Sequence, residues 1–121
     1  MCGINGIISK SLEIDLNKNI NKMNDKIIHR GPDDDGCYYE TNINFSVALG
    51  MRRLSIIDLS NGSQPMYSDD KQVVIVFNGE IYNYQKLKKE LEENNISFRT
   101  NSDTEVILKL YIENGTESFS K

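Results

Sequence analysis

The sequence has few of the features that mark several large classes of protein. Its 121 residues include no tryptophan, two cysteines, two prolines and one histidine. The longest apolar runs, such as residues 73–77, suit a strand and are far too short to span a membrane. The N-terminus also lacks the basic and then apolar stretch of a secretory signal. We therefore expect a cytoplasmic protein with no membrane partner.

The charge pattern lacks a basic surface. Lysine and arginine number 14 against 18 aspartates and glutamates, which gives a net charge of −4. No stripe of basic residues that could follow a phosphate backbone is present, so nucleic acid is not an expected partner. A Gly-rich phosphate-binding loop is also missing, so no nucleotide site is expected in this segment.

The residues that usually hold metals are scarce. A zinc site would have to combine Cys2, His29 and Cys37 with an aspartate, and the chain has no C-x-x-C pair to support one. A calcium loop aligned on Gly36 has the wrong residue types at both of its end positions. We expect no metal, and in a cytoplasmic setting we expect both cysteines to be free thiols.

The length allows one domain, and the apolar spacing predicts mixed strands and helices. The first strand is expected to be buried through Ile4, Ile7 and Ile8, and the first helix is expected to cover a sheet. Turn-forming residues predict loops at residues 33–36 and 58–68. Strands are expected at residues 4–8, 37–39, 45–57, 72–77 and 97–99, and helices at residues 16–28, 84–91 and 102–114.

Two consecutive arginines stand inside a predicted strand. Side chains alternate between the faces of a strand, so Arg52 and Arg53 must point in opposite directions. A solvated face suits Arg52, which leaves Arg53 pointing towards a core or a cleft, where a guanidinium usually meets a carboxylate.

Cys2 directly follows the initiator methionine. If Met1 is removed, Cys2 carries both a thiol and a free α-amine. An α-amine titrates at about 7.7–8.0 and a free thiol at about 8.5, so near neutral pH such an amine can accept a thiol proton. This pairing is one way of activating a weak nucleophile. The alternative is an ordinary cysteine near a frayed terminus.

Two further positions permit both a structural and a functional interpretation. Asn78-Gly79 suits a hairpin turn, but the following residues have helical spacing, so the pair stands between a strand and a helix and can aim an amide and a backbone N–H at one spot. Ser102 and Glu105 have the spacing of a capping box. Asp103 would then sit at the first helical position, where a carboxylate suits the helix dipole and needs no other role.

Six ordered motifs together resemble the class II glutamine amidotransferase domain, and within that class they look most like glutamine-hydrolysing asparagine synthetase. The resemblance covers the whole chain. The motifs are Met-Cys-Gly-Ile at 1–4, His-Arg-Gly-Pro-Asp at 29–33, Arg-Leu-Ser-Ile-Ile-Asp at 53–58, Gln-Pro-Met at 64–66, Asn-Gly-Glu-Ile-Tyr-Asn at 78–83 and Ser-Asp-Thr-Glu-Val-Ile at 102–107.

The resemblance implies an α+β fold, the four-layer αββα sandwich of N-terminal nucleophile hydrolases. It also implies that residues 1–121 are a C-terminally truncated amidotransferase domain, without the family's later strands and without the synthetase domain. ATP and magnesium would belong to that absent domain, and this segment would need no cofactor.

The resemblance further implies the roles of individual residues. Cys2 would attack the side-chain amide of glutamine, and Asn78 and Gly79 would donate N–H groups to the oxyanion. Arg53 would bind the α-carboxylate of glutamine and Asp103 its α-ammonium, while His29 would have no catalytic role. The rest of the glutamine site would be Leu54, Ser55, Ile56, Ile57 and Glu80.

The implied partners are glutamine and the synthetase domain, to which the released ammonia would pass for ATP-dependent conversion of aspartate to asparagine. Three other interpretations stay open. The chain could bind glutamine without turnover, serve a related amidotransferase with another acceptor, or act on a different amide. A site with both Arg53 and Asp103 suits a free amino acid, which argues against the last of these.

Overall fold

The computed structural model describes residues 2–10, 13–54 and 62–120. Over these ranges the chain forms antiparallel sheets and helices, so the fold class is α+β. The elements are β1 (Gly3–Ser9), α1 (Leu16–Lys26), the 3-10 helix η1 (Ile28–Arg30), β2 (Asp34–Thr41), β3 (Ser46–Arg53), β4 (Met66–Tyr67), β5 (Val74–Ile75), α2 (Tyr84–Glu93), α3 (Asp103–Asn114) and the 3-10 helix η2 (Gly115–Ser120).

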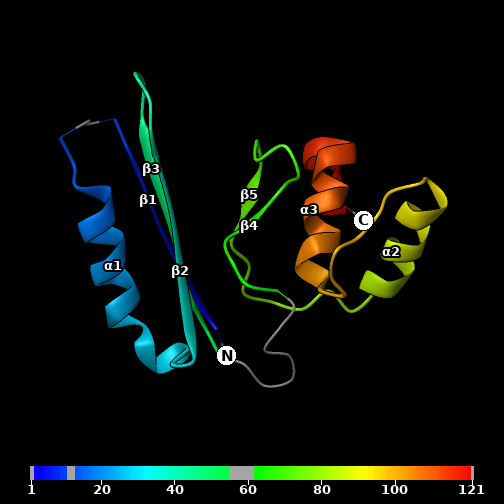
Figure 1. Ribbon diagram of the computed structural model, residues 1–121, viewed down its shortest axis with the longest axis horizontal. Coiled ribbons are helices and arrows are strands. Elements are labelled where there is room, and N and C mark those ends of the chain that lie inside the picture. The colour runs from blue at the N-terminus through cyan, green and yellow to red at the C-terminus, as the bar shows by residue number, and fades with distance from the viewer. Residues whose placement is uncertain (1, 11–12, 55–61, 121) are drawn as a thin grey trace.

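The first half of the chain is a three-stranded antiparallel sheet in the order β1-β3-β2, with α1 packed on one face (Figure 1). The predicted first helix and the sheet that it covers are confirmed. Leu16 and Ile20 of α1 pack on Ala48 of β3, because the helical spacing puts both apolar side chains on the side that faces the sheet. The helix ends at Lys26, and η1 then leads the chain into β2.

The residues of β1 that face away from α1 are largely exposed, which corrects the expectation that Ile4 and Ile8 are buried together with Ile7. Ile4 is 46% exposed and Ile8 is 83% exposed, whereas Ile7 points to the opposite face and packs against the core under α1. Because side chains alternate along a strand, one helix can cover only half of them. The α1 side is therefore the only side on which β1 contributes to this core, within the described residues.

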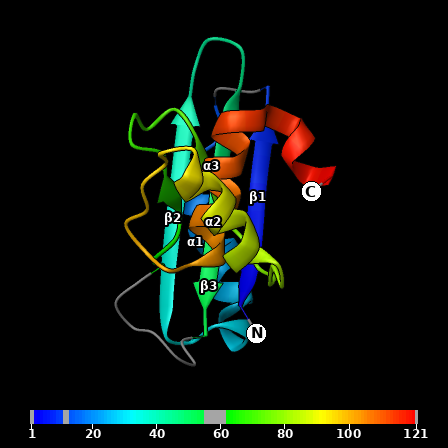
Figure 2. The ribbon, with the colours of Figure 1, turned by 90° about the vertical axis from the view of Figure 1, so that its right-hand side faces the viewer.

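The second half combines two helices with a small hairpin. Leu87 and Leu91 of α2 pack against Val106 and Leu110 of α3, as the predicted helical spacings require. Strands β4 and β5 pair antiparallel and lie beside α3. Figures 1 and 2 show this half stacked on the three-stranded sheet, on the side away from α1.

Two strand predictions and one loop prediction in this half are wrong. The strand expected at residues 72–77 contains only β5 and is half-exposed, and β4 lies inside a predicted loop. The turn between them forms because Ser68 accepts from Val73 through its hydroxyl and Lys71 N–H donates to the Ser68 carbonyl. Residues 97–99 form no strand, since the Arg99 N–H donates to a side chain instead of a neighbouring strand.

The placement of Arg52 also corrects a prediction. Its side chain does not lie on a solvated face, because the residue is only 8% exposed. Arg52 Nε donates to the Gly31 carbonyl at 2.9 Å, and Nη1 lies 3.3 Å from an Asp35 carboxylate oxygen. Asp35 pairs with Arg52 in the β2–β3 register, so β2 begins earlier than predicted and includes part of the expected 33–36 loop.

Of the helices in the described ranges, none combines the length and the apolar character that a bilayer crossing requires.

Candidate active site

The β1–β3 register places Cys2 beside the end of β3. Gly3 pairs with Arg52, so the residues just before Gly3 and just after Arg52 lie at the same end of the sheet. The Leu54 N–H donates to Cys2 Sγ at 3.5 Å, which fixes the sulfur near the start of the segment after β3. The sheet therefore positions both the thiol and Arg53, which had been predicted to point away from Arg52.

Asn78 and Gly79 lie on the connection between β5 and α2. The chain continues into a helix, so the hairpin interpretation of this pair is wrong. A Cβ atom on Gly79 would lie 2.8 Å from Cζ at the end of the Phe77 ring, so a larger residue here would require that ring to shift. Both residues are exposed, and the backbone of this turn is open to an approaching ligand.

The start of α3 is capped as predicted by Ser102, whose hydroxyl accepts from the Thr104 N–H at 3.1 Å. The second hydrogen bond of the predicted capping box, in which the Glu105 carboxylate would accept from the Ser102 N–H, does not form. The Glu105 carboxylate turns away from the cap and accepts from the backbone N–H groups of Arg99, at 2.9 Å, and Thr100, at 2.7 Å. It is completely buried, so it ties the preceding loop to the helix.

Burial disfavours the charged form of Glu105, but these hydrogen bonds outweigh it. The donors are the Arg99 N–H and the Thr100 hydroxyl and N–H, and the Arg99 guanidinium adds a favourable charge. Together they hold the pKa of the Glu105 carboxyl below its ordinary value.

Asp103 makes a hydrogen bond in addition to its favourable position at the start of the helix. Its Oδ2 accepts from the Ile81 N–H at 3.1 Å, which ties the connection that carries Asn78 and Gly79 to the start of α3. The carboxylate thus joins two segments that are more than twenty residues apart in the sequence.

Cys2, Arg53, Asn78, Gly79 and Asp103 line one pocket of about 160 Å³. They come from the residue before β1, the end of β3, the β5–α2 connection and the start of α3. Of the other predicted residues, Leu54 reaches Cys2 through its N–H, and Glu80 is exposed and outside the pocket lining. The predicted Ser55, Ile56 and Ile57 lie outside the described residues.

The pocket also has lining residues that sequence reasoning did not assign to it. These are Gly62, Gln64, Phe77, Ser102 and Thr104. Gln64 belongs to the quoted Gln-Pro-Met motif, so the signal for it was present, but nothing in the spacing indicated which segments its amide would reach.

The remaining thiol and histidine lie elsewhere. Cys37 contacts Asn21 and Asn24 through its sulfur, and burial, with the nearby Asp35 charge, raises the pKa of the Cys37 thiol. His29 is exposed in η1. Among the residues that the structure describes, no group of three or more His, Cys, Asp or Glu side chains could hold a metal ion.

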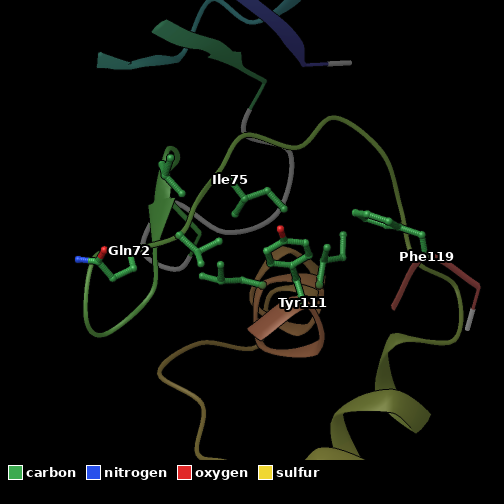
Figure 3. Close-up of a pocket in the computed structure, with 8 residues that line it drawn as sticks. Gln72, Ile75, Tyr111 and Phe119 are labelled. Carbon is green, nitrogen blue, oxygen red and sulfur yellow. The ribbon is translucent and has the colours of Figure 1, made fainter. Parts of the chain in front are cut away.

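A larger pocket of about 400 Å³ lies between β5 and α3. Figure 3 shows Ile75 and Tyr111 lining it, with Gln72 and Phe119 towards its edges. Its described lining is mostly aliphatic and aromatic and contains no thiol, carboxylate or basic group. The smaller pocket contains a thiol, a carboxylate and a guanidinium, so it is the candidate active site.

Comparison with known proteins assigns this chain to a family. The family model of the glutamine amidotransferase domain matches residues 1–121. The chain belongs to the glutamine amidotransferase domain family. This confirms the resemblance carried by the six motifs.

Curated relatives agree with this assignment. The chain is 45% identical over 124 residues to asparagine synthetase [glutamine-hydrolyzing] 1 of Bacillus subtilis, which covers 100% of this chain and 19% of the relative. It is 42% identical over 118 residues to asparagine synthetase B [glutamine-hydrolyzing] of Escherichia coli, covering 97% and 20%. For asparagine synthetase [glutamine-hydrolyzing] 1 of Arabidopsis thaliana the identity is 39% over 118 residues, covering 97% and 19%. The chain thus spans about one fifth of the length of these relatives.

Proposed function

We propose that this chain is the glutaminase part of a glutamine-hydrolysing asparagine synthetase, with residues 1–121 forming part of its amidotransferase domain. The observation that carries the proposal is the pocket shared by Cys2, Arg53, Asn78, Gly79 and Asp103. A thiol, two candidate oxyanion donors and one group of each charge are what hydrolysis of a free amino acid amide requires. The names of the relatives support the same activity.

In this proposal Cys2 is the nucleophile and its α-amine is the base, once Met1 has been removed. The sulfur attacks the side-chain amide carbon of glutamine, and the thiol proton passes through the amine to the departing nitrogen, which leaves as ammonia. Water then cleaves the γ-glutamyl thioester, which releases glutamate and restores the thiol.

The Asn78 side-chain N–H and the Gly79 backbone N–H would donate to the negative oxygen of the tetrahedral intermediate. Such donors act mainly in the transition state, and loss of one typically lowers the rate by about 10²–10³-fold. The pocket supports this role, because Asn78 and Gly79 line it together with Cys2.

Arg53 and Asp103 would recognise the two charged groups at the other end of glutamine. A guanidinium can bind a carboxylate with two parallel hydrogen bonds, and a carboxylate can accept from an ammonium. The Asp103 carboxylate already accepts from Ile81, so its orientation is set before glutamine arrives. We further propose that Glu80 and the backbone of residues 54–57 complete the site.

The released ammonia would serve ATP-dependent conversion of aspartate to asparagine by a synthetase domain, which would hold ATP and magnesium. We also infer that α1, the three-stranded sheet, the β4–β5 sheet and the α2–α3 pair correspond to the four layers of an N-terminal nucleophile hydrolase sandwich. Their order in Figure 1 supports this correspondence.

Ammonia release from glutamine by wild type and Cys2→Ala tests the proposal. Cys2→Ala should bind glutamine with little change, because the thiol forms the new bond and contributes little to recognition, but it should release no ammonia. Cys37→Ala is the matched control and should keep the activity. Undiminished hydrolysis by Cys2→Ala would refute the mechanism, and a wild type that binds glutamine without releasing ammonia would instead indicate a binding module.

A further inference from the structure

Gln64 makes hydrogen bonds to two segments of the pocket from opposite ends of its side-chain amide. Oε1 accepts from the Phe77 N–H at 2.6 Å, and Nε2 donates to the Thr104 hydroxyl oxygen at 3.4 Å. The orientation of the amide is unambiguous, because a backbone N–H can only donate and the hydroxyl can accept. The shorter bond, to Phe77, is the stronger one.

The bond to Phe77 is one of two anchors that bracket Asn78 and Gly79. Phe77 N–H is held by Gln64, and Ile81 N–H is held by the Asp103 carboxylate. The chain between these two anchors is neither helix nor strand, so no ladder of backbone hydrogen bonds positions it. The two side chains therefore set where the N–H groups of this turn point.

The main chain of Gln64 is seated on the sheet that carries Cys2. A Cβ atom on Gly36 of β2 would lie 2.0 Å from the Gln64 carbonyl oxygen and 2.7 Å from Pro65 Cδ. Only glycine at this position lets the segment lie directly on β2. Gln64 thus has its backbone on the half of the molecule that holds the thiol and its amide on the half that holds Asn78 and Gly79.

We propose that Gln64 is a positioning residue that sets the Asn78 and Gly79 donors against the Cys2 sulfur. This inference rests on the proposed glutaminase function. Gln64 does not need to touch glutamine for this role, since it acts through the Phe77 backbone. Its contribution should be greatest in the transition state, where the oxyanion forms and where donor placement matters most.

Gln64→Leu removes both side-chain hydrogen bonds while keeping a side chain of similar size. A thiol-directed glutamine analogue labels Cys2, and kcat for glutamine hydrolysis is normalised to the labelled fraction. We expect this kcat to fall about 10–10²-fold, because displacing the oxyanion donors should lower the rate no more than removing one of them. KM should change less than about threefold, since Arg53 and Asp103 are untouched. Gln64→Glu keeps an acceptor for the Phe77 N–H and should retain more of kcat than Gln64→Leu.

Gln85→Leu is the matched control, because Gln85 is exposed on α2 and outside the pocket, and its kcat and KM should equal those of wild type. A residue that only stabilises the fold would lower the labelled fraction and leave kcat per labelled site unchanged. That result, or equal kcat losses in Gln64→Glu and Gln64→Leu, would overturn the proposal.

Amide hydrogen exchange separates this inference from the proposed function. In Gln64→Leu the Phe77 amide should exchange faster while the Ile81 amide keeps its wild-type rate. An unchanged Phe77 rate overturns the positioning role even if wild type hydrolyses glutamine. If wild type releases no ammonia, the proposed function fails, and so does a role for Gln64 in it, whatever the Phe77 amide shows.

Discussion

Replacing Glu105 by glutamine should destabilise the protein far more than its similar size suggests. The Glu105 carboxylate is 0% exposed and accepts from Arg99 N–H, Thr100 N–H and the Thr100 hydroxyl at 2.9, 2.7 and 2.6 Å. Glutamine offers one oxygen and one NH₂ group. If its oxygen faces Thr100, its NH₂ group faces the Arg99 N–H, and two donors then meet in a buried place.

The cost follows from these contacts. A hydrogen bond to a charged group contributes about 1.5–3 kcal/mol, and a buried donor left without a partner costs about 1–3 kcal/mol. We expect the free energy of unfolding to fall by about 2–4 kcal/mol for Glu105→Gln. With an unfolding entropy of about 2.1 cal/mol/K per residue over 121 residues, Tm should fall by about 8–16 °C.

The pH dependence gives a second signature. The hydrogen bonds hold the folded-state pKa of Glu105 below its ordinary value of 4.5, so its stabilising contribution is fully present above that value. It is lost as the pH falls from there through the folded-state pKa. The difference in unfolding free energy between wild type and Glu105→Gln should therefore be constant near neutral pH and shrink below about pH 4.5.

Urea unfolding at a series of pH values measures both effects. Glu92→Gln, at an exposed position on α2, is the control and should lie within about 0.5 kcal/mol of wild type. A Glu105→Gln variant as stable as this control would refute the reasoning, and so would a stability difference that grows as the pH falls.

Three further predictions concern the pocket. Asp103→Asn can still accept from Ile81 but cannot neutralise an ammonium, so KM for glutamine should rise about 10- to 100-fold with little change in Tm; a lower Tm with an unchanged KM would assign Asp103 to the helix alone. One extra residue ahead of Cys2 replaces the amine by a peptide N–H, so glutamine should still bind but hydrolysis should slow by about 10²–10⁴-fold; full activity would point to another base, with His29 the first to test. A thiol-directed glutamine analogue should label Cys2 and spare Cys37, because burial and Asp35 raise the pKa of the Cys37 thiol; peptide mass mapping that finds the label on Cys37 would contradict this.

Helices could be predicted from this sequence because their apolar spacing is local. Leu87 and Leu91 indicate α2, and Leu16 and Ile20 indicate α1, without knowledge of any distant contact. Strand predictions failed at residues 72–77 and 97–99, where side chains that the spacing does not reveal accept from the backbone N–H groups of Val73, Phe77 and Arg99. The Arg99 N–H could have joined a strand, but the buried Glu105 carboxylate takes it.

The same distinction holds within the site. Alternation along a strand correctly predicts that Arg52 and Arg53 point in opposite directions, but it does not reveal which face offers a partner. That depends on the β2–β3 register, which brings Asp35 opposite Arg52. Gln64 went unassigned for a related reason, since its role depends on Gly36, Phe77 and Thr104, which lie far from it in the sequence.

The pairing of β3 with both its neighbours also limits how this chain can change in length. The β2–β3 connection, residues 42–45, lies at the far end of the sheet from Cys2, because Thr41 pairs with Ser46 while Gly3 pairs with Arg52. Added residues there would leave both registers intact, so this tip suits an inserted tag or label. A single deletion inside β3 would exchange the faces of the two arginines and turn towards the pocket the guanidinium that now binds Asp35 and Gly31.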